Sequence, residues 1–311
     1  MAKFRDSISQ FDNTTFFTDA GIETVLIFHE DLDLPEFAAF PLIQHEQGRQ
    51  VLERYFRDCA AIALEHKMGF VFEAPTWRAS QVWGDKLGYD AASMAQVNTQ
   101  AIEFLAAIRE DLESEGTPMP ISGCFGSSCD GYNPVNLMSV DEAKAYHQVQ
   151  MDTFAQSQAD MVTAMTMAYV EEATGIALAA KEANMPVVIA FTVETDGKLP
   201  SGQPLGEAIQ QVDEATEGYP QYYMINCAHP THFDFMLKDA GDWSERIHGI
   251  RANASCMSHE ELDNAEELDD GNPTELGQQY KALRDLLPNL RVMGGCCGTD
   301  KRHLEAIAKA F

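Results

Sequence analysis

Short apolar segments alternate along the chain with longer amphipathic stretches. Eight of these segments have the length, and the content of valine, isoleucine, phenylalanine and methionine, that are typical of buried strands. They cover residues 14–21, 68–75, 119–126, 160–167, 186–193, 221–228, 247–254 and 289–296. Because a stretch with helical character follows each of them, the pattern predicts strands that alternate with helices.

The stretches between the predicted strands carry helix signals. Helices are predicted over residues 48–67, 99–113, 143–156 and 301–311. Ser139, with Glu142 three positions later, forms a capping box before the third of these helices. Residues 28–40 form a long first connection between strand and helix, and we expect this connection to cover one end of the fold.

Eight strands that each precede a helix predict a (β/α)8 TIM barrel, formed as a single domain by residues 1–311. The alternative is a doubly wound open sheet, which usually has a glycine-rich nucleotide loop after its first strand. Residues 18–28 match such a loop poorly. The chain has no low-complexity linker and no break in composition, which also favours one domain.

Composition and charge narrow the possible partners. The chain has 311 residues and a formal net charge of -28, with 21 Lys and Arg against 49 Asp and Glu. This excess of negative charge argues against nucleic acid and anionic membranes as partners. The densest acidic stretch, residues 259–270, is expected to be a solvated surface.

The expected location is the cytoplasm. The first 17 residues lack the apolar run of a signal peptide, and no stretch reaches the roughly 18 apolar residues of a membrane span. In the cytoplasm the seven cysteines should be mostly reduced, which favours metal-binding or catalytic roles over disulfides.

Polar and thiol side chains gather at the carboxyl ends of the predicted strands, where TIM barrels have their active sites. These residues are Asp19, Glu23, Glu73, Trp77, Cys124, Thr166, Glu194, Cys227, Asn253, Cys296 and Cys297. Cys59 lies in a predicted amphipathic helix and is expected to be buried in the core. Cys124, Cys129 and Cys256 are not expected to bind a metal.

Cys296 and Cys297 are adjacent, between glycines on both sides. Neighbouring cysteines form a strained disulfide, so two ligands for one metal are a better explanation. Cys227 would supply a third thiolate, and three protein ligands with one open position are typical of catalytic zinc. Only the barrel would bring Cys227 close to the pair, and small buried cysteines at a tight turn remain the alternative.

Four segments carry a family resemblance that spans almost the whole chain. "INCAHP" (225–230) and the distant "GGCCGT" (294–299) resemble the homocysteine S-methyltransferase family of zinc-dependent barrels. "TDAGIET" (18–24) and "SGCFGSSCDGY" (122–132) are similar to the first-strand and third-strand segments of that family. The resemblance implies a Zn²⁺ ion bound by Cys227, Cys296 and Cys297, which would also be the catalytic residues.

The resemblance also implies a reaction. A thiol bound to the zinc would lose its proton and attack the methyl group of a sulfonium or ammonium donor, converting homocysteine to methionine. The glycines beside the cysteine pair would allow the backbone angles that turn both sulfurs toward the metal. Because the chain ends with the barrel, a small donor such as S-methylmethionine or betaine is expected.

Substrate contacts are assigned by the same resemblance and by position at the strand ends. They are Asp19, Glu23, Thr166, Asn226 and Trp77. Aromatic faces attract methylated cations, so a cage around the donor could include Trp77, Phe125, Tyr132 and Tyr169. For any one of these residues, ordinary packing is the favoured alternative.

The chain departs from the family at three positions. Met165 replaces the glutamate that usually precedes Thr166 and holds the amino group of homocysteine. Glu23 stands where glycine is more common, so it is a candidate replacement, and Ser127 stands where proline is usual. Three alternatives therefore stay open: a different thiol or selenol acceptor, a zinc-binding barrel without activity, and a redox protein, which the absence of a Cys-x-x-Cys motif disfavours. The sequence leaves the oligomeric state open.

Overall fold

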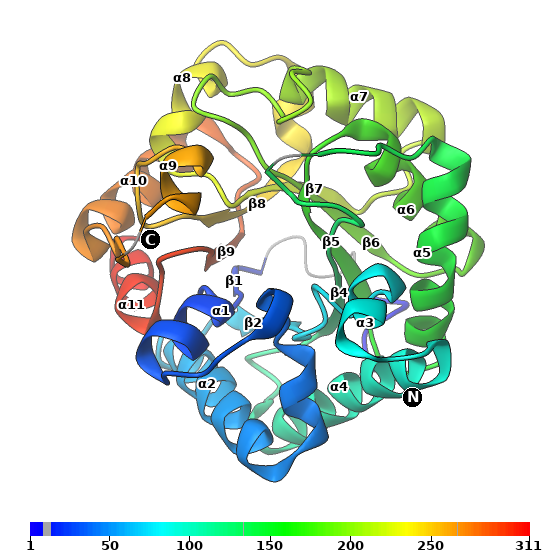
Figure 1. The fold of residues 1–311 in the computed structure, drawn as a ribbon. Helices are drawn as coiled ribbons and strands as arrows, with labels where there is room; N and C mark the ends of the chain where they lie inside the picture. The colour runs from blue at the N-terminus through cyan, green and yellow to red at the C-terminus, as the bar shows by residue number, and fades with distance from the viewer. Residues whose placement is uncertain (9–13, 133, 266) are drawn as a thin grey trace.

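The computed structural model describes residues 1–8, 14–132, 134–265 and 267–311, and parallel strands in it form a barrel surrounded by helices (Figure 1). The strands are β1 (Phe16–Phe17), β2 (Gly69–Phe70), β3 (Phe72–Glu73), β4 (Ile121–Phe125), β5 (Met161–Met167), β6 (Val187–Phe191), β7 (Tyr222–Asn226), β8 (Ile247–Ala252) and β9 (Val292–Gly295). Each of the eight predicted strand segments contains at least one of them, which confirms the predicted pattern.

The strands are ordered β2-β1-β9-β8-β7-β6-β5-β4-β3, and every neighbouring pair is parallel. β2 and β3 are two segments of one barrel strand, separated by Val71, so the sheet closes on itself between β1 and β4. The (β/α)8 barrel is therefore confirmed, and the doubly wound alternative is excluded.

The outer layer consists of long helices between successive strands. They are α2 (Glu46–Glu65), α4 (Ala91–Leu112), α5 (Val140–Ala155), α6 (Val170–Glu182), α7 (Leu205–Thr216), α10 (Pro273–Leu286) and α11 (Lys301–Ala310). The four predicted helices lie within or overlap α2, α4, α5 and α11. The capping box of Ser139 and Glu142 is present at the start of α5, which satisfies two backbone donors at that end.

Short helices lie in the connections. They are α1 (Ile22–Thr24), η2 (Val25–His29), η3 (Pro35–Phe37), η4 (Phe40–Gln44), α3 (Gln81–Leu87), η5 (Pro230–His232), α8 (Asp234–Leu237), η6 (Asp242–Arg246) and α9 (His259–Asp263). No helix in the described ranges is both long and apolar enough to cross a membrane.

The apolar core has two parts. The larger part lies between the outer face of the barrel and the helices. The smaller part fills the barrel itself and includes Phe16, Val71, Met161, Met165, Val188 and Met224. At the amino-terminal end of the strands, the backbone N–H groups of Lys3 and Phe4 donate to Asp160, so the first residues of the chain cover that end. The opposite end holds the polar side chains described next.

Candidate metal and substrate site

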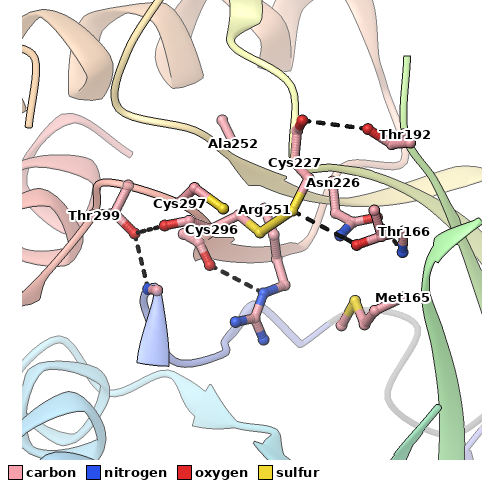
Figure 2. The surroundings of a disulfide bond; sticks show 12 residues. Met165, Thr166, Thr192, Asn226, Cys227, Arg251, Ala252, Cys296, Cys297 and Thr299 are labelled. Atoms are coloured by element: carbon pink, nitrogen blue, oxygen red, sulfur yellow. Dashed lines mark hydrogen bonds between the residues drawn. A yellow bond between two sulfur atoms is a disulfide. The ribbon is translucent and has the colours of Figure 1, made fainter. Parts of the chain in front are cut away.

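The three predicted cysteine ligands come together at the carboxyl ends of two strands. Cys227 follows β7, and Cys296 and Cys297 follow β9, with β8 between them (Figure 2). Their sulfur atoms all lie within 4.8 Å of one another. Sulfurs at the vertices of a tetrahedron around zinc, each about 2.3 Å from the ion, are about 3.8 Å apart. The donor set therefore fits a zinc ion or another thiophilic metal.

Cys227 and Cys296 are joined by a disulfide, with 5.4 Å between their Cα atoms (Figure 2). This pair is an exception to the expectation of mostly reduced cysteines, since the other five are free. The reason is their placement, because side chains that face one ion also face each other closely enough to bond. Metals bind thiolates, so the disulfide must be reduced before both residues can act as ligands. Cys297 keeps a free thiol.

The glycines around the cysteine pair act mainly by leaving space. A Cβ atom on Gly21 would lie 2.3 Å from the carbonyl oxygen of Cys296, and one on Gly295 would lie 2.1 Å from Oγ1 of Thr299. Only Gly298, with a φ of +79°, needs the backbone freedom predicted from the sequence. The Thr299 hydroxyl donates to the Cys296 carbonyl at 2.7 Å and accepts from the Gly21 N–H at 3.0 Å. Close packing of β1 against β9 therefore fixes the backbone beside the cysteines.

Thr166 and Asn226, both predicted to contact substrate, form a hydrogen-bonded pair beside Cys227 (Figure 2). Asn226 donates to the Thr166 hydroxyl at 2.8 Å and accepts from the Thr166 N–H at 2.9 Å. The hydroxyl in turn donates to Sγ of Cys227 at 3.6 Å. Thr166 and Cys227 both have left-handed backbone, with φ of 61° and 52°. Such conformations are costly for residues with a Cβ atom, so the surrounding contacts must hold them.

A histidine and a tyrosine complete the surroundings of the cysteines. Nε2 of His259 donates to the Cys227 carbonyl at 2.7 Å, and its Nδ1 lies 3.0 Å from the Glu194 carboxylate. The His259 ring stacks on Tyr132, with 3.9 Å between ring centroids. The Tyr132 hydroxyl lies 3.5 Å from Sγ of Cys297. Two of the three cysteines are therefore contacted by this stacked pair.

Sequence reasoning missed His259 because it begins the acidic stretch 259–270, which was expected to be surface. Most of that stretch follows the expectation, since Glu260 and Glu261 are exposed. The first residue of α9 is instead buried against β7. The available signal was Ser258 with Glu261, a capping box that marks where this helix begins.

Asp19, predicted to face the amino group of homocysteine, is already engaged by protein side chains. Its Oδ1 accepts from Arg251 Nη1 at 2.6 Å, and its Oδ2 accepts from the Tyr55 hydroxyl at 2.9 Å. Arg251 lies on β8 and is also buried. The sequence analysis did not find this ion pair, and the pair compensates the charge of Asp19.

Two other carboxyl groups in this region have little positive charge nearby to stabilise their ionised form. Burial, with a smaller contribution from nearby Asp19, raises the pKa of Glu23 to about 7. Burial likewise raises the pKa of Glu73 to about 7, against the opposing effect of Arg251. Oε1 of Glu73 accepts from the Thr163 hydroxyl at 2.9 Å, while Oε2 has no hydrogen-bond partner among the described residues. Either carboxylate could accept hydrogen bonds from a cationic substrate.

Met165 is buried in the barrel interior, so no carboxylate occupies the position where the family has glutamate. Trp77 is half-buried beside it, and its Nε1 donates to the Met165 carbonyl at 3.4 Å. For two of the four aromatic cage candidates, the contacts in the structure are those of ordinary packing. Phe125 points outward and packs edge-on against Phe154 of α5, and Tyr169 is buried in the core.

Ser127, which replaces the usual proline, attaches its loop to α6. Its hydroxyl donates to Glu172 Oε2 at 2.6 Å, and the Ser128 N–H donates to Oε1 at 2.8 Å. Nε2 of His147 lies 3.0 Å from the same carboxylate. Hydrogen bonds therefore restrain the loop where a proline ring would otherwise do so.

Comparison with known proteins agrees with this geometry. The family model described as homocysteine S-methyltransferase matches residues 17–311. The homocysteine methyltransferase MmuM of Escherichia coli in its metallated form is 15% identical, with a TM-score of 0.73 over 98% of this chain and 99% of the other. Its oxidized form is 14% identical, with a TM-score of 0.75 over 99% of each chain. At these identities the likeness shows the fold. No curated protein matches in sequence.

Proposed function

The chain belongs to the homocysteine S-methyltransferase family, and from this premise we propose that it methylates the thiol of homocysteine to give methionine, at a zinc ion bound by Cys227, Cys296 and Cys297. Membership of the family makes the protein an S-methyltransferase. The observation that carries the finer proposal is the set of three cysteine sulfurs within 4.8 Å at the carboxyl end of the barrel. We include a cytoplasmic location in the proposal, where these thiols would stay reduced.

When bound, zinc would act as a Lewis acid that lowers the pKa of the acceptor thiol at its open position. The ion and its three thiolate ligands together would carry a small net negative charge. The acceptor sulfur would therefore stay electron-rich. The acceptor thiol would release its proton to solvent, and the new bond would form between its sulfur and the donor methyl carbon. The bond from that carbon to the sulfonium or ammonium centre breaks, and its electron pair stays with the donor.

The chain's own residues orient the ligands. The Asn226–Thr166 pair holds Sγ of Cys227, and His259 fixes the carbonyl of the same residue. The Tyr132 hydroxyl lies within hydrogen-bond distance of Sγ of Cys297. Hydrogen bonds to ligand sulfurs withdraw charge from them and tune the metal, as outer contacts do in other metal sites.

The amino group of homocysteine needs a carboxylate, and Glu23 is our candidate. Asp19 is already paired with Arg251, and Met165 cannot supply a charge. Glu23 follows Gly21, which packs against the Cys296 carbonyl, and precedes Thr24, whose hydroxyl accepts from the Gly298 N–H, so this segment lies beside the cysteine cluster. An acceptor that is a different thiol or selenol remains the second possibility, because of Met165.

The test is turnover by the reduced, zinc-loaded protein. Homocysteine is incubated with S-methylmethionine, betaine or another small methyl sulfonium, and methionine is detected by mass. We expect methionine with at least one donor and none with Cys227→Ser. Zinc-bound enzyme that methylates other thiols but never homocysteine would refute the proposed acceptor.

X-ray absorption at the zinc edge tests the mode of activation separately. Direct binding of the acceptor sulfur should add one sulfur to the three supplied by cysteine. An unchanged sulfur count at saturating homocysteine would contradict direct activation.

A further inference from the structure

A pocket of about 870 Å³ lies between three loops at the carboxyl end of the barrel. The long connection 28–40 contributes one wall, so it borders the mouth as the sequence predicted. The loops after β3 and β4 contribute the others. Much of the wall is apolar, from Leu34, Phe37, Val82, Val135 and Met138. Phe37, Val82 and Val135 are exposed, so the pocket has an apolar rim open to solvent.

Arg78 is the buried cation of this pocket. Only 7% of the residue is exposed. Its guanidinium carbon lies 3.6 Å from the centre of the Trp83 ring and 4.1 Å from that of Trp77. Nη1 donates to the Cys129 carbonyl at 3.4 Å, while Nε has no hydrogen-bond partner in the part of the chain that the structure describes. Two indole rings thus fix the orientation of a guanidinium with few hydrogen bonds of its own.

A buried guanidinium is costly unless its five N–H groups find acceptors. Stacking on indole recovers part of this cost but supplies no hydrogen-bond acceptor in the ring plane. Among the described residues Arg78 forms no ion pair. Burial lowers its pKa, although the carboxylates of Asp130, Glu23 and Glu36 oppose this effect. The missing acceptor is expected to come from a ligand.

The shape of the group indicates which ligand. A planar guanidinium matches a carboxylate, because two parallel N–H···O bonds can form at once. The apolar walls suit the aliphatic part of the same molecule. Trp77 connects the pocket to the site, since it stacks on Arg78 and donates to the carbonyl of Met165, next to Thr166.

We propose that Arg78, held between Trp77 and Trp83, binds the carboxylate of a methyl-transfer substrate in this pocket. The inference rests on the proposed function, in which both homocysteine and donors such as S-methylmethionine or betaine carry a carboxylate. Arg78 thereby sets specificity for substrates that are acids.

Tryptophan fluorescence can report this binding without any turnover. Two of the three tryptophans flank Arg78, and the third, Trp243, packs against Gly206 elsewhere, so Trp243→Phe removes the background. The zinc-loaded protein is titrated with homocysteine, S-methylmethionine and betaine, each against its methyl ester. We expect saturable changes with the acid of at least one substrate, and at least tenfold weaker binding of its ester. The acid that responds identifies the source of the carboxylate.

Variants complete the test. Arg78→Met should weaken that acid at least tenfold, and Arg78→Lys should restore part of the loss because the charge returns without the planar fork. Lys309→Met is the matched control. Its ammonium is exposed, pairs with Glu305 at 3.3 Å and does not line the pocket, so binding should change less than twofold.

Equal binding of acid and ester, or equal KM values in the wild type and folded Arg78→Met, would overturn the pocket proposal. If carboxylates bind through Arg78 but homocysteine is never methylated, the proposed function fails and the pocket proposal stands. If methionine forms with no dependence on Arg78, the reverse holds.

Discussion

Buried acidic side chains lie at both ends of the barrel, but they are hydrogen-bonded to different extents. At the amino-terminal end, the Asp160 carboxylate accepts from the backbone N–H groups of Lys3, Phe4 and Ile121 at 2.6 to 2.9 Å. It also forms a buried ion pair with Arg109 at 2.6 Å. Four donors surround two oxygens, so this end of the barrel is complete without any other molecule.

The carboxyl end retains buried polar atoms without partners among the described residues. They include Oε2 of Glu73, both side-chain polar atoms of Asn253, and Nε of Arg78. Each such atom destabilises the folded protein. Where such atoms lie at the carboxyl ends of the strands, they are candidates for contacts that a substrate would complete. The charge of Asp160 is thus compensated within the protein, whereas polar groups at the opposite end remain available for the proposed binding role.

The largest effect should come from the cysteines. After reduction, Cys227→Ser, Cys296→Ser and Cys297→Ser should each lose zinc and methyl transfer almost completely, while the fold remains because a large core does not depend on the metal. Protein kept oxidised should also take up little zinc, since two ligands are bonded to each other. Metal analysis and circular dichroism measure both.

The exposed Cys256→Ser is the control and should keep its zinc. Full zinc retention in all three ligand variants would refute the site, and collapse of the circular dichroism spectrum on chelation would refute the independence of the fold.

Asp160→Asn should lower the stability of the protein and leave its activity unchanged, the opposite of the cysteine variants. Removing one partner of a buried ion pair typically costs about 3–5 kcal/mol of unfolding free energy, and Arg109 would be left without its carboxylate. Urea unfolding measures this loss. The kcat of the folded fraction should stay at the wild-type value. An altered KM for either substrate would contradict a purely structural role for the amino-terminal end of the barrel.

Glu73→Gln should change how stability depends on pH. Glu73 has a pKa of about 7 in the folded protein against 4.5 as its ordinary value, so the unfolded chain releases this proton first as pH rises. Stability therefore falls between pH 4.5 and 7, by up to about 3 kcal/mol from this group.

The glutamine cannot ionise, so the variant should gain stability relative to the wild type at pH 8 compared with pH 5. Thermal unfolding at the two pH values tests this, with the exposed Glu46→Gln as control. A difference between variant and wild type that is the same at both pH values would contradict the assignment.

The smallest effect concerns Glu23. If its carboxylate holds the amino group, Glu23→Ala should raise the KM for homocysteine by about ten- to a hundredfold, the equivalent of roughly 1.5–3 kcal/mol for a charged hydrogen bond. Thiols without an amino group should be barely affected. If no residue has replaced the family glutamate, the wild type should discriminate poorly and Met165→Glu should improve discrimination.

Strong selectivity for the amino group that survives Glu23→Ala would contradict both hypotheses, that Glu23 replaces the family glutamate and that no residue does. The carboxylates of Asp19 and Glu73 would then be the next to examine.

The sequence predicted the barrel well because its signals are local. Strands buried on both faces are apolar throughout, and the capping box before α5 needs only Ser139 and Glu142. The strand order followed from the (β/α) repeat, and that order brought Cys227 to the cysteine pair. The predicted substrate roles of Asp19, Glu23, Thr166, Asn226 and Trp77 stay predictions.

Features that depend on register between distant strands were missed. Arg251 is the one arginine in the apolar segment 247–254, and its partner Asp19 is far away in the sequence. The two residues can be paired only when it is known that β8 and β1 lie on either side of β9. Phe125 was assigned to the mouth because it ends a strand. Successive residues of a strand face opposite sides, so the inward Cys124 sends Phe125 outward. The sequence shows this alternation but not its phase.

The packing of β9 against β1 also has a consequence for biosynthesis. Synthesis runs from the amino terminus, so Cys296 and Cys297 leave the ribosome after all the other barrel strands. Their backbone is held by Gly21, in the first connection of the chain, and the barrel must close before the three thiols can meet. Under the proposed function, metal insertion would therefore be a late event in the maturation of this protein, which follows closure of the barrel.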